Sequence, residues 1–281
     1  MTIIHRLSTT AFGTAVVVGT AMFASSVQAA SLGLKPIDLR TWTKEGLGGN
    51  WEVSSDGTSV LQTLHGLPTF FVSPDEFINK TITGKFKVEP KGNYDNDFIG
   101  FVFGYQSPIA VNGDQANNFN FLLFDWRQSP QEGAKEGFSL AKVNGNFNFR
   151  LGQPHPNFWV HKESEEFDLL DTDYGKGKGW KDNTEYDFSL LYQTDRIKID
   201  IDGKTIFDVS GEFQPGRFGF YNFSQSHVRY SGFTQADIAP EPPKSVPEPT
   251  SGLGLLTFGA LGTGALLKRK QQQKVLDSSI S

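Results

Sequence analysis

The chain has 281 residues, 20% of them charged and 37% hydrophobic, and it includes 25 Phe, 30 Gly and 2 Met. This composition is too aromatic for a disordered protein and too rich in glycine for a helical bundle, so it favours one all-β domain. The region between Ala30 and Ala239 holds 20 of the 26 basic and 28 of the 31 acidic residues, which gives it a formal charge of −8. That charge repels a phosphate backbone, so nucleic-acid partners are disfavoured and divalent cations are better candidates. Because the chain has no cysteine, thiol catalysis, cysteine zinc sites and disulfides are excluded.

Residues 1–29 are predicted to form a secretory signal helix. No charged residue lies between Ser8 and Val27, and His5 and Arg6 precede this stretch. The small and apolar residues around Ala29 suit cleavage by signal peptidase. An N-terminal membrane anchor is the alternative, but the apolar stretch is short for a membrane span, so export is favoured.

The central region, residues 30–238, is predicted to fold as a β-sandwich. From Arg196 to Asp202 every second residue is isoleucine and the others are charged, which is typical of a strand with one buried and one solvated face. Asp202 and Gly203 supply the turn of a hairpin whose second arm is Lys204–Val209. The other predicted strands are Ser59–Leu64, Thr81–Val88, Phe98–Tyr105, Phe119–Trp126, Phe138–Val143, Glu185–Gln193, Arg217–Phe223 and Val228–Phe233. About a dozen short strands without a long helical period predict two packed antiparallel sheets.

The predicted strand Phe98–Tyr105 carries glycine repeatedly. Alternation places Ile99, Phe101, Phe103 and Tyr105 on one face, and Gly100, Val102 and Gly104 on the other. Since glycine is a poor strand former, its repetition predicts a close approach by another backbone or by a large ring. We therefore expect a tightly packed layer at this strand.

Several of these segments together resemble the thrombospondin C-terminal domain. The stretch Asp95–Gln106, followed by Phe119–Gln128, resembles the central hairpin of that domain. Three further stretches also resemble parts of that domain and occur in the same order as in the domain. They are Trp51–Thr63, Gly179–Asp182 and Arg217–Gln225. The resemblance covers roughly residues 38–237.

The resemblance implies a concanavalin-like or lectin-like jelly-roll sandwich that binds calcium and acts in adhesion or matrix contacts without catalysis. Animal thrombospondins carry epidermal-growth-factor-like modules and aspartate-rich calcium repeats before this domain. No such segments precede it in this sequence. Receptor-binding functions of the animal proteins are therefore not transferred.

Asp95, Asn96 and Asp97 are the candidate calcium ligands. They offer hard oxygen atoms on a loop directly before a predicted strand, and calcium takes six to eight such oxygens. The three side chains supply only part of that shell, so backbone carbonyls, waters or a second loop would complete it. Other candidate oxygens lie in Asn112-Gly113-Asp114 and in the pair Asp171 and Asp173. The alternative is that Asp95–Asp97 is a solvated turn that caps the strand.

The acidic run Glu163–Asp168 raises the alternative of a secreted glycoside hydrolase or lyase, because concanavalin-like folds also host such enzymes. Those enzymes need two carboxylates about 5–9 Å apart in a cleft. The spacing departs from the E-x-D-x-E pattern of laminarinase-like enzymes, so a solvated acidic loop is favoured. The residues His65, His155, His161 and His227 lack the spacing of a zinc site. The side chains of Trp126, Trp159 and Trp180 could stack on sugar rings, but in so aromatic a domain most of them are expected in the core.

The C-terminal segment resembles a tripartite PEP-CTERM sorting signal, which an exosortase recognises. A proline-rich linker, residues 239–251, contains the PEP motif Val246, Pro247, Glu248 and Pro249. Residues 252–270 comprise sixteen uncharged residues, predicted as a transmembrane helix, and the basic cluster Lys268, Arg269 and Lys270. The polar tail 271–281 departs from the usual signal, and a simple single-span anchor is the alternative. The resemblance implies a bacterial surface or matrix protein.

Taken together, the sequence predicts an exported, calcium-binding, non-enzymatic protein of the bacterial envelope or extracellular matrix. Its expected partners are an extracellular polysaccharide or surface protein, an exosortase, and the inner membrane before the C-terminal signal is processed. A purely structural matrix protein without a defined ligand is a further alternative.

Overall fold

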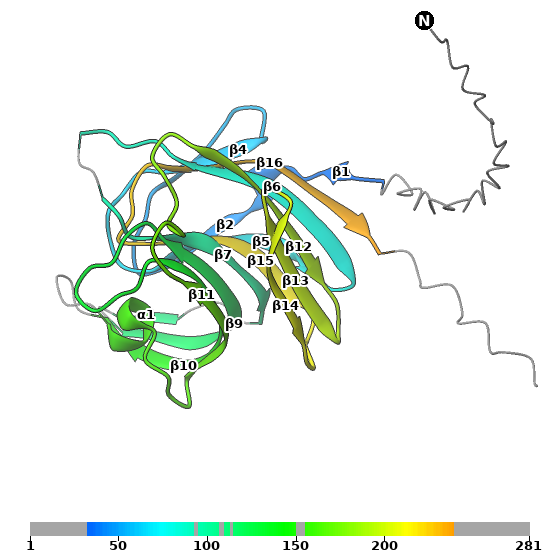
Figure 1. The fold of residues 1–281 in the computed structure, drawn as a ribbon. Coiled ribbons are helices and arrows are strands. Elements are labelled where there is room, and N and C mark those ends of the chain that lie inside the picture. The colour runs from blue at the N-terminus through cyan, green and yellow to red at the C-terminus, as the bar shows by residue number, and fades with distance from the viewer. Residues whose placement is uncertain (1–32, 93–94, 107–109, 113–114, 150–154, 239–281) are drawn as a thin grey trace, which may run out of the picture. The chain divides into compact units, whose positions relative to one another are not determined.

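The computed structural model describes residues 33–92, 95–106, 110–112, 115–149 and 155–238. In these residues the chain forms two antiparallel sheets, which Figure 1 shows stacked as two layers. The predicted all-β jelly-roll sandwich is therefore confirmed. Among the described residues, no helix combines the length and the apolar character needed to cross a membrane. The predicted signal helix and the predicted C-terminal helix lie outside the described residues.

Each sheet has eight strands, and β4, β5, β6 and β7 alternate between the two sheets along the chain. The first sheet runs in the order β14 (Lys204–Ser210), β13 (Arg196–Ile201), β12 (Glu185–Tyr192), β6 (Lys80–Val88), β16 (Val228–Asp237), β4 (Ser59–Gln62) and β3 (Trp51–Val53), with β1 (Lys35–Pro36) beside β16. The second runs in the order β11 (Phe167–Tyr174), β10 (Gly137–Asn148), β9 (Gln115–Arg127), β7 (Phe98–Tyr105), β15 (Gly216–Phe223), β5 (Thr69–Phe77) and β2 (Thr43–Gly46), with β8 (Ala110–Asn112) beside β9. A 3₁₀ turn (Leu39–Thr41) and the short helix α1 (Pro156–Val160) complete the fold.

The predicted hairpin of β13 and β14 is confirmed. Asp202 and Gly203 connect the two strands, with φ values of 49° and 73°. Two consecutive positive φ values are those of a type I′ turn, whose twist matches that of the strands it joins. The alternating isoleucines of β13 are buried in the core between the sheets.

The close approach predicted from the glycines of β7 is also confirmed. A Cβ atom on Gly100 would lie 2.0 Å from the backbone oxygen of Phe124 on β9, and one on Gly104 would lie 2.5 Å from Oη of Tyr192. The predicted facing of Tyr105 was wrong. Gly104 has a φ of 59° and breaks the alternation, so Tyr105 packs against Phe70 and Phe121 in a second cluster rather than in the core between the sheets.

Two aromatic clusters lie on opposite faces of the second sheet. The first fills the space between the sheets and includes Trp126 and Trp180. The second lies on the outer face and includes Phe158 and Trp159 of α1. Figure 1 shows α1 beside β10 of this sheet. The expectation that Trp126, Trp159 and Trp180 belong to the core is confirmed, since each is at most 6% exposed.

A candidate cation site before strand β7

Backbone and side-chain hydrogen bonds hold the three residues before β7 in place. The amide of Asp97 donates to Oε1 of Gln225 over 3.0 Å, and its carbonyl accepts from Nε1 of Trp180 over 3.1 Å. The carbonyl of Asn96 accepts from the amide of Gln128 over 3.3 Å. These bonds come from three separate parts of the chain, so the loop is fixed against the sandwich.

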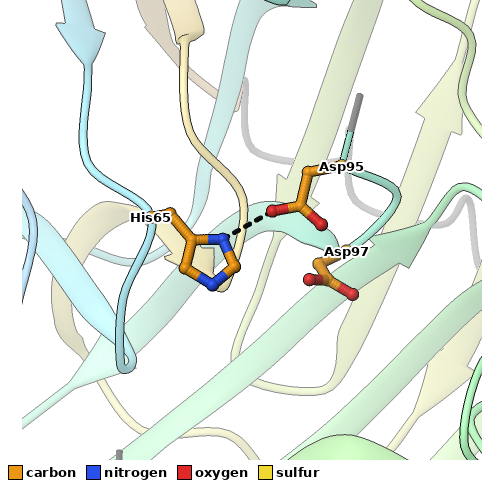
Figure 2. Close-up of side chains that lie close together, drawn as sticks. All are labelled: His65, Asp95 and Asp97. Carbon is orange, nitrogen blue, oxygen red and sulfur yellow. Dashed lines mark hydrogen bonds and ion pairs between the residues drawn. The ribbon is translucent and has the colours of Figure 1, made fainter. Parts of the chain in front are cut away.

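Asp95 and Asp97 converge on His65, which lies on the loop between β4 and β5. Nδ1 of His65 is 2.5 Å from Oδ2 of Asp95, and one ligand atom from each of the three residues lies within 4.8 Å of the others (Figure 2). Nε2 of His65 is 3.3 Å from Oγ of Ser224. His65 is exposed and Asp95 is partly buried, whereas Asp97 is only 2% exposed. The cluster therefore combines one solvent-facing side with one buried carboxylate.

Arg127 lies behind Asp97 and is fully buried. Its Nη2 is 2.7 Å from Oδ1 of Asp97 and donates to Oδ1 of Asn96 over 3.2 Å. The guanidinium stacks between the rings of Phe98 and Trp159, at 4.7 Å and 4.4 Å from their centroids. The side-chain oxygen of Asn96 is thus bonded to Arg127.

Burial raises the pKa of Asp97 to about 7. The positive charge of Arg127 opposes this shift, while the neighbouring carboxyl of Asp95 adds to it. Two carboxylates in contact disfavour each other's ionised form, and a cation placed between them relieves that repulsion. The arrangement is therefore suited to binding a hard divalent cation through the oxygens of Asp95 and Asp97.

The other predicted oxygen ligands are arranged differently. Asp173 forms an ion pair with Lys178, and Asp171 is exposed and accepts from the amide of Thr172 over 2.7 Å. Asn112 ends strand β8, but Gly113 and Asp114 lie outside the described residues.

The acidic run before β11 is exposed, as expected of a solvated loop. Glu163 lies in the loop before the strand, and Glu165 and Glu166 form the turn that leads into it; the amide of Glu166 donates to Oγ of Ser164 over 3.2 Å. Asp168 lies on β11 itself and is also exposed.

Sequence reasoning identified the two aspartates but missed His65, Arg127 and Ser224. His65 precedes Asp95 by 30 residues, and Ser224 follows His65 by 159. Nothing in the local spacing of these residues signals a shared site. Only the stacking order of strands from both sheets brings the three loops together.

Comparison with known proteins agrees with the fold and with the order of the motifs. Residues 47–236 match the family described as thrombospondin C-terminal region. The chain belongs to the thrombospondin C-terminal family. Residues 245–270 match the PEP-CTERM protein-sorting motif. Both resemblances seen in the sequence are thereby confirmed, and the sorting motif indicates an exported or cell-surface protein.

Thrombospondins from animals are among the relatives of this family member. Thrombospondin-2 of Gallus gallus is 30% identical over 198 residues, which cover 65% of this chain and 16% of that protein. Thrombospondin-2 of Mus musculus is 28% identical over 214 residues, which cover 70% of this chain and 17% of that protein. The chain thus spans only about a sixth of the length of these relatives.

A solved domain that was crystallised with an oligosaccharide shares the sandwich fold. The exoplasmic/lumenal domain of VIP36, in a form bound to Ca²⁺ and Man3GlcNAc, superposes with a TM-score of 0.51 at 12% identity. The superposition covers 74% of this chain and 92% of that domain. At this level of identity the similarity shows the fold alone.

Proposed function

We propose that this protein is an exported, non-enzymatic binding protein whose sandwich binds calcium and contacts an extracellular polysaccharide or another surface protein. The observation that carries the calcium assignment is the convergence of Asp95 and Asp97 beside His65. Membership of the thrombospondin C-terminal family and the sorting motif support a role in adhesion or matrix contacts at the bacterial envelope. The VIP36 domain, which has the same fold, was solved with calcium and an oligosaccharide.

The donor set fits calcium in part. Asp95 and Asp97 supply carboxylate oxygens, and calcium would complete its six to eight ligands with waters and backbone carbonyls. Asn96 would have to give up its hydrogen bond to Arg127 to contribute its side-chain oxygen. Calcium would hold both carboxylates ionised and would tie the loop before β7 to the rest of the site.

The C-terminal segment supports a route to the cell surface. We propose that an exosortase recognises Val246, Pro247, Glu248 and Pro249 together with the uncharged stretch and the cluster Lys268, Arg269 and Lys270. The uncharged stretch would hold the protein in the inner membrane until the signal is processed.

Thermal unfolding with and without calcium tests the metal site. An ion present at a hundred times its dissociation constant stabilises the folded state by about 2.7 kcal/mol, which corresponds to roughly 5–10 °C for a domain of this size. We therefore expect the unfolding midpoint of the purified protein to rise by that amount when calcium replaces EDTA. The double variant Asp95→Asn/Asp97→Asn is expected to lose the rise.

The matched control is Asp171→Asn/Asp173→Asn, which also removes two carboxylates but lies on β11. This variant is expected to keep the calcium response. If the β11 variant loses the rise with calcium and the Asp95/Asp97 variant keeps it, the calcium site lies on β11. A wild-type midpoint that is unchanged by calcium would refute the calcium proposal.

A further inference from the structure

A cleft of about 500 Å³ opens at the end of the second sheet, beside the loop that connects β14 to β15. One wall is formed by side chains of β9, β10 and β11, and the other by the ends of β12 and β14 and by residues 211–214 of the connecting loop. Small-molecule sites commonly have volumes of about 300–1,000 Å³. The cleft is therefore large enough for a short stretch of a polymer.

The sheet wall of the cleft continues the face that bears the core between the sheets. On β9, Phe124 belongs to that core, and Asn120 lies four residues earlier on the same face. On β10, Leu140 belongs to the core, and Asn144 lies four residues later on the same face. Because side chains alternate with a period of two, the face changes from apolar to polar along both strands. Such a change is expected only where the face is no longer covered by the opposite sheet.

The polar side chains of this wall are adjacent across the strands. Asn120 pairs in register with Asn144, and Lys142 pairs with Asp168. All four side chains are exposed. No hydrogen bond to the side-chain amide of Asn120 or Asn144 is formed within the part of the chain that the structure describes, so both can meet a ligand.

The chemistry of the cleft suits a hydroxyl-rich ligand. Each asparagine amide offers two donors and one acceptor oxygen, which match hydroxyl groups that both donate and accept hydrogen bonds. Phe213, on the opposite wall, is partly exposed and adds an apolar ring surface. A sugar presents hydroxyl groups at its edge and carbon-bound hydrogens on its face, so one sugar unit can use both walls.

The charges of the cleft select against an acidic ligand. Lys142 is the basic residue of its lining, while Asp168 and Glu212 are acidic. The region from Ala30 to Ala239 carries a formal charge of −8. A polyanion would therefore be repelled both locally and by the domain as a whole.

We propose that this cleft binds a neutral polysaccharide through Asn120 and Asn144. The inference rests on the proposed polysaccharide-binding function and adds to it a site and a class of polymer. The site is distinct from the calcium cluster, whose aspartates precede β7.

Native affinity electrophoresis tests the site with defined polymers. The probes are mannan, dextran and laminarin as neutral polysaccharides, and alginate as an acidic one. We expect at least one neutral polymer to retard the wild-type protein. Loss of two amides is expected to weaken that binding about tenfold or more in Asn120→Ala/Asn144→Ala. The isosteric variant Asn120→Asp/Asn144→Asp, which keeps the side-chain volume, is expected to show the same loss.

The control is Asn148→Ala, which changes an exposed asparagine on the same strand β10 that does not line the cleft. It is expected to bind like wild type. Because the changed side chains are exposed, every variant should unfold at the wild-type midpoint, which reports on folding independently.

The remaining outcomes overturn the inference in distinguishable ways. If neutral polymers retard wild type and both double variants equally, the binding function stands but the cleft is not its site. If only alginate retards the protein, the class of polymer is wrong. If no polymer retards wild type, the cleft and the polysaccharide part of the function both fail, and the calcium measurement is unaffected. If the polymer is shortened and Asp168→Asn or Glu212→Gln abolishes the shortening, the cleft is catalytic.

Discussion

Arg127 and Asp97 form a buried ion pair at the entrance to β7. Arg127 is fully buried, and its Nη1 atom has no hydrogen-bond partner among the described residues. Removing charges from water costs free energy, and the two aromatic rings that flank the guanidinium recover only part of that cost. The pair therefore contributes little net stability by itself, but removing one partner would leave the other charge buried and uncompensated.

The raised pKa of Asp97 predicts a pH dependence for the calcium-free protein. Since burial raises the pKa of Asp97 from 3.8 to about 7, the folded state binds more protons than the unfolded state between these values. The corresponding stability is present at low pH and is lost as the pH rises through about 7. In EDTA, we expect the unfolding midpoint to fall by about 5 °C from pH 5 to pH 8, or roughly 2 kcal/mol.

The variant Asp97→Asn removes the titration, because an amide does not ionise. It also leaves Arg127 without its partner, which lowers the midpoint at every pH, so the comparison concerns only how the midpoint changes with pH. The fall in the unfolding midpoint between pH 5 and pH 8 is expected in wild type and should be absent in Asp97→Asn. Asp171→Asn, an exposed aspartate on β11, should keep the wild-type profile. Parallel profiles for wild type and Asp97→Asn would show that Asp97 ionises normally in the folded protein.

At the scale of elements, α1 covers the outer face of the second sheet. Phe158 is fully buried, and its ring centroid lies 5.0 Å from that of Phe147 and 5.2 Å from that of Phe149. His161, which follows the helix with a φ of 54°, bonds to Oδ2 of Asp125 over 3.0 Å and to Oη of Tyr174 over 2.6 Å. Packing and hydrogen bonds, rather than helix propensity, therefore hold this short helix in place, since so few residues are marginal as an isolated helix.

Truncating Phe158 tests whether α1 is an integral part of the sandwich. We expect Phe158→Ala to lower the free energy of unfolding by about 3–5 kcal/mol, because it leaves a cavity among aromatic rings. Lys162→Ala, an exposed neighbour, should change it by less than about 0.5 kcal/mol. Urea denaturation measures both. A loss below about 1 kcal/mol for Phe158→Ala would mean that the helix does not pack as described.

Local sequence patterns predicted the strands that have one buried and one solvated face. Strand β13 alternates strictly and is followed by Asp202 and Gly203, so its hairpin was evident from sequence. Strand β5 was missed because Phe70, Phe71 and Val72 are buried on both faces and Pro74 follows them, which removes the alternation. Strand β11 was missed because its acidic residues obscure the pattern of an edge strand.

The sequence predicted the oxygen-bearing residues of the candidate cation site but not the residues that surround them. Asp95 and Asp97 were evident because they precede a strongly predicted strand. Arg127 pairs in register with Phe98, and His65 approaches from a loop between strands of different sheets. Neither relation can be read from local spacing, because both depend on how the strands are ordered.

At the scale of the molecule, two aromatic clusters stabilise a domain that has no disulfides. The second sheet buries both of its faces, one against the first sheet and one against α1 and its loops. Each fully buried aliphatic or aromatic side chain contributes about 1.5–3 kcal/mol before the cost of ordering the chain. A cysteine-free domain outside the cell can thus be stabilised by apolar burial, to which a calcium ion would add.

The sorting motif lies outside the folded sandwich, so export and calcium binding can be tested independently. Residues 245–270 lie beyond Ile238, the last described residue of the sandwich. In a bacterium that has an exosortase, we expect the triple variant Pro247→Ala/Glu248→Ala/Pro249→Ala to accumulate in the membrane fraction, because the recognised tripeptide is absent while the uncharged stretch remains. Cell fractionation followed by immunoblotting measures this.

The variant Gln271→Ala/Gln272→Ala/Gln273→Ala, in the polar tail, should distribute like wild type, and the calcium response of the purified proteins should be unchanged in both. Equal distribution of the triple variant and wild type would show that the tripeptide does not direct sorting.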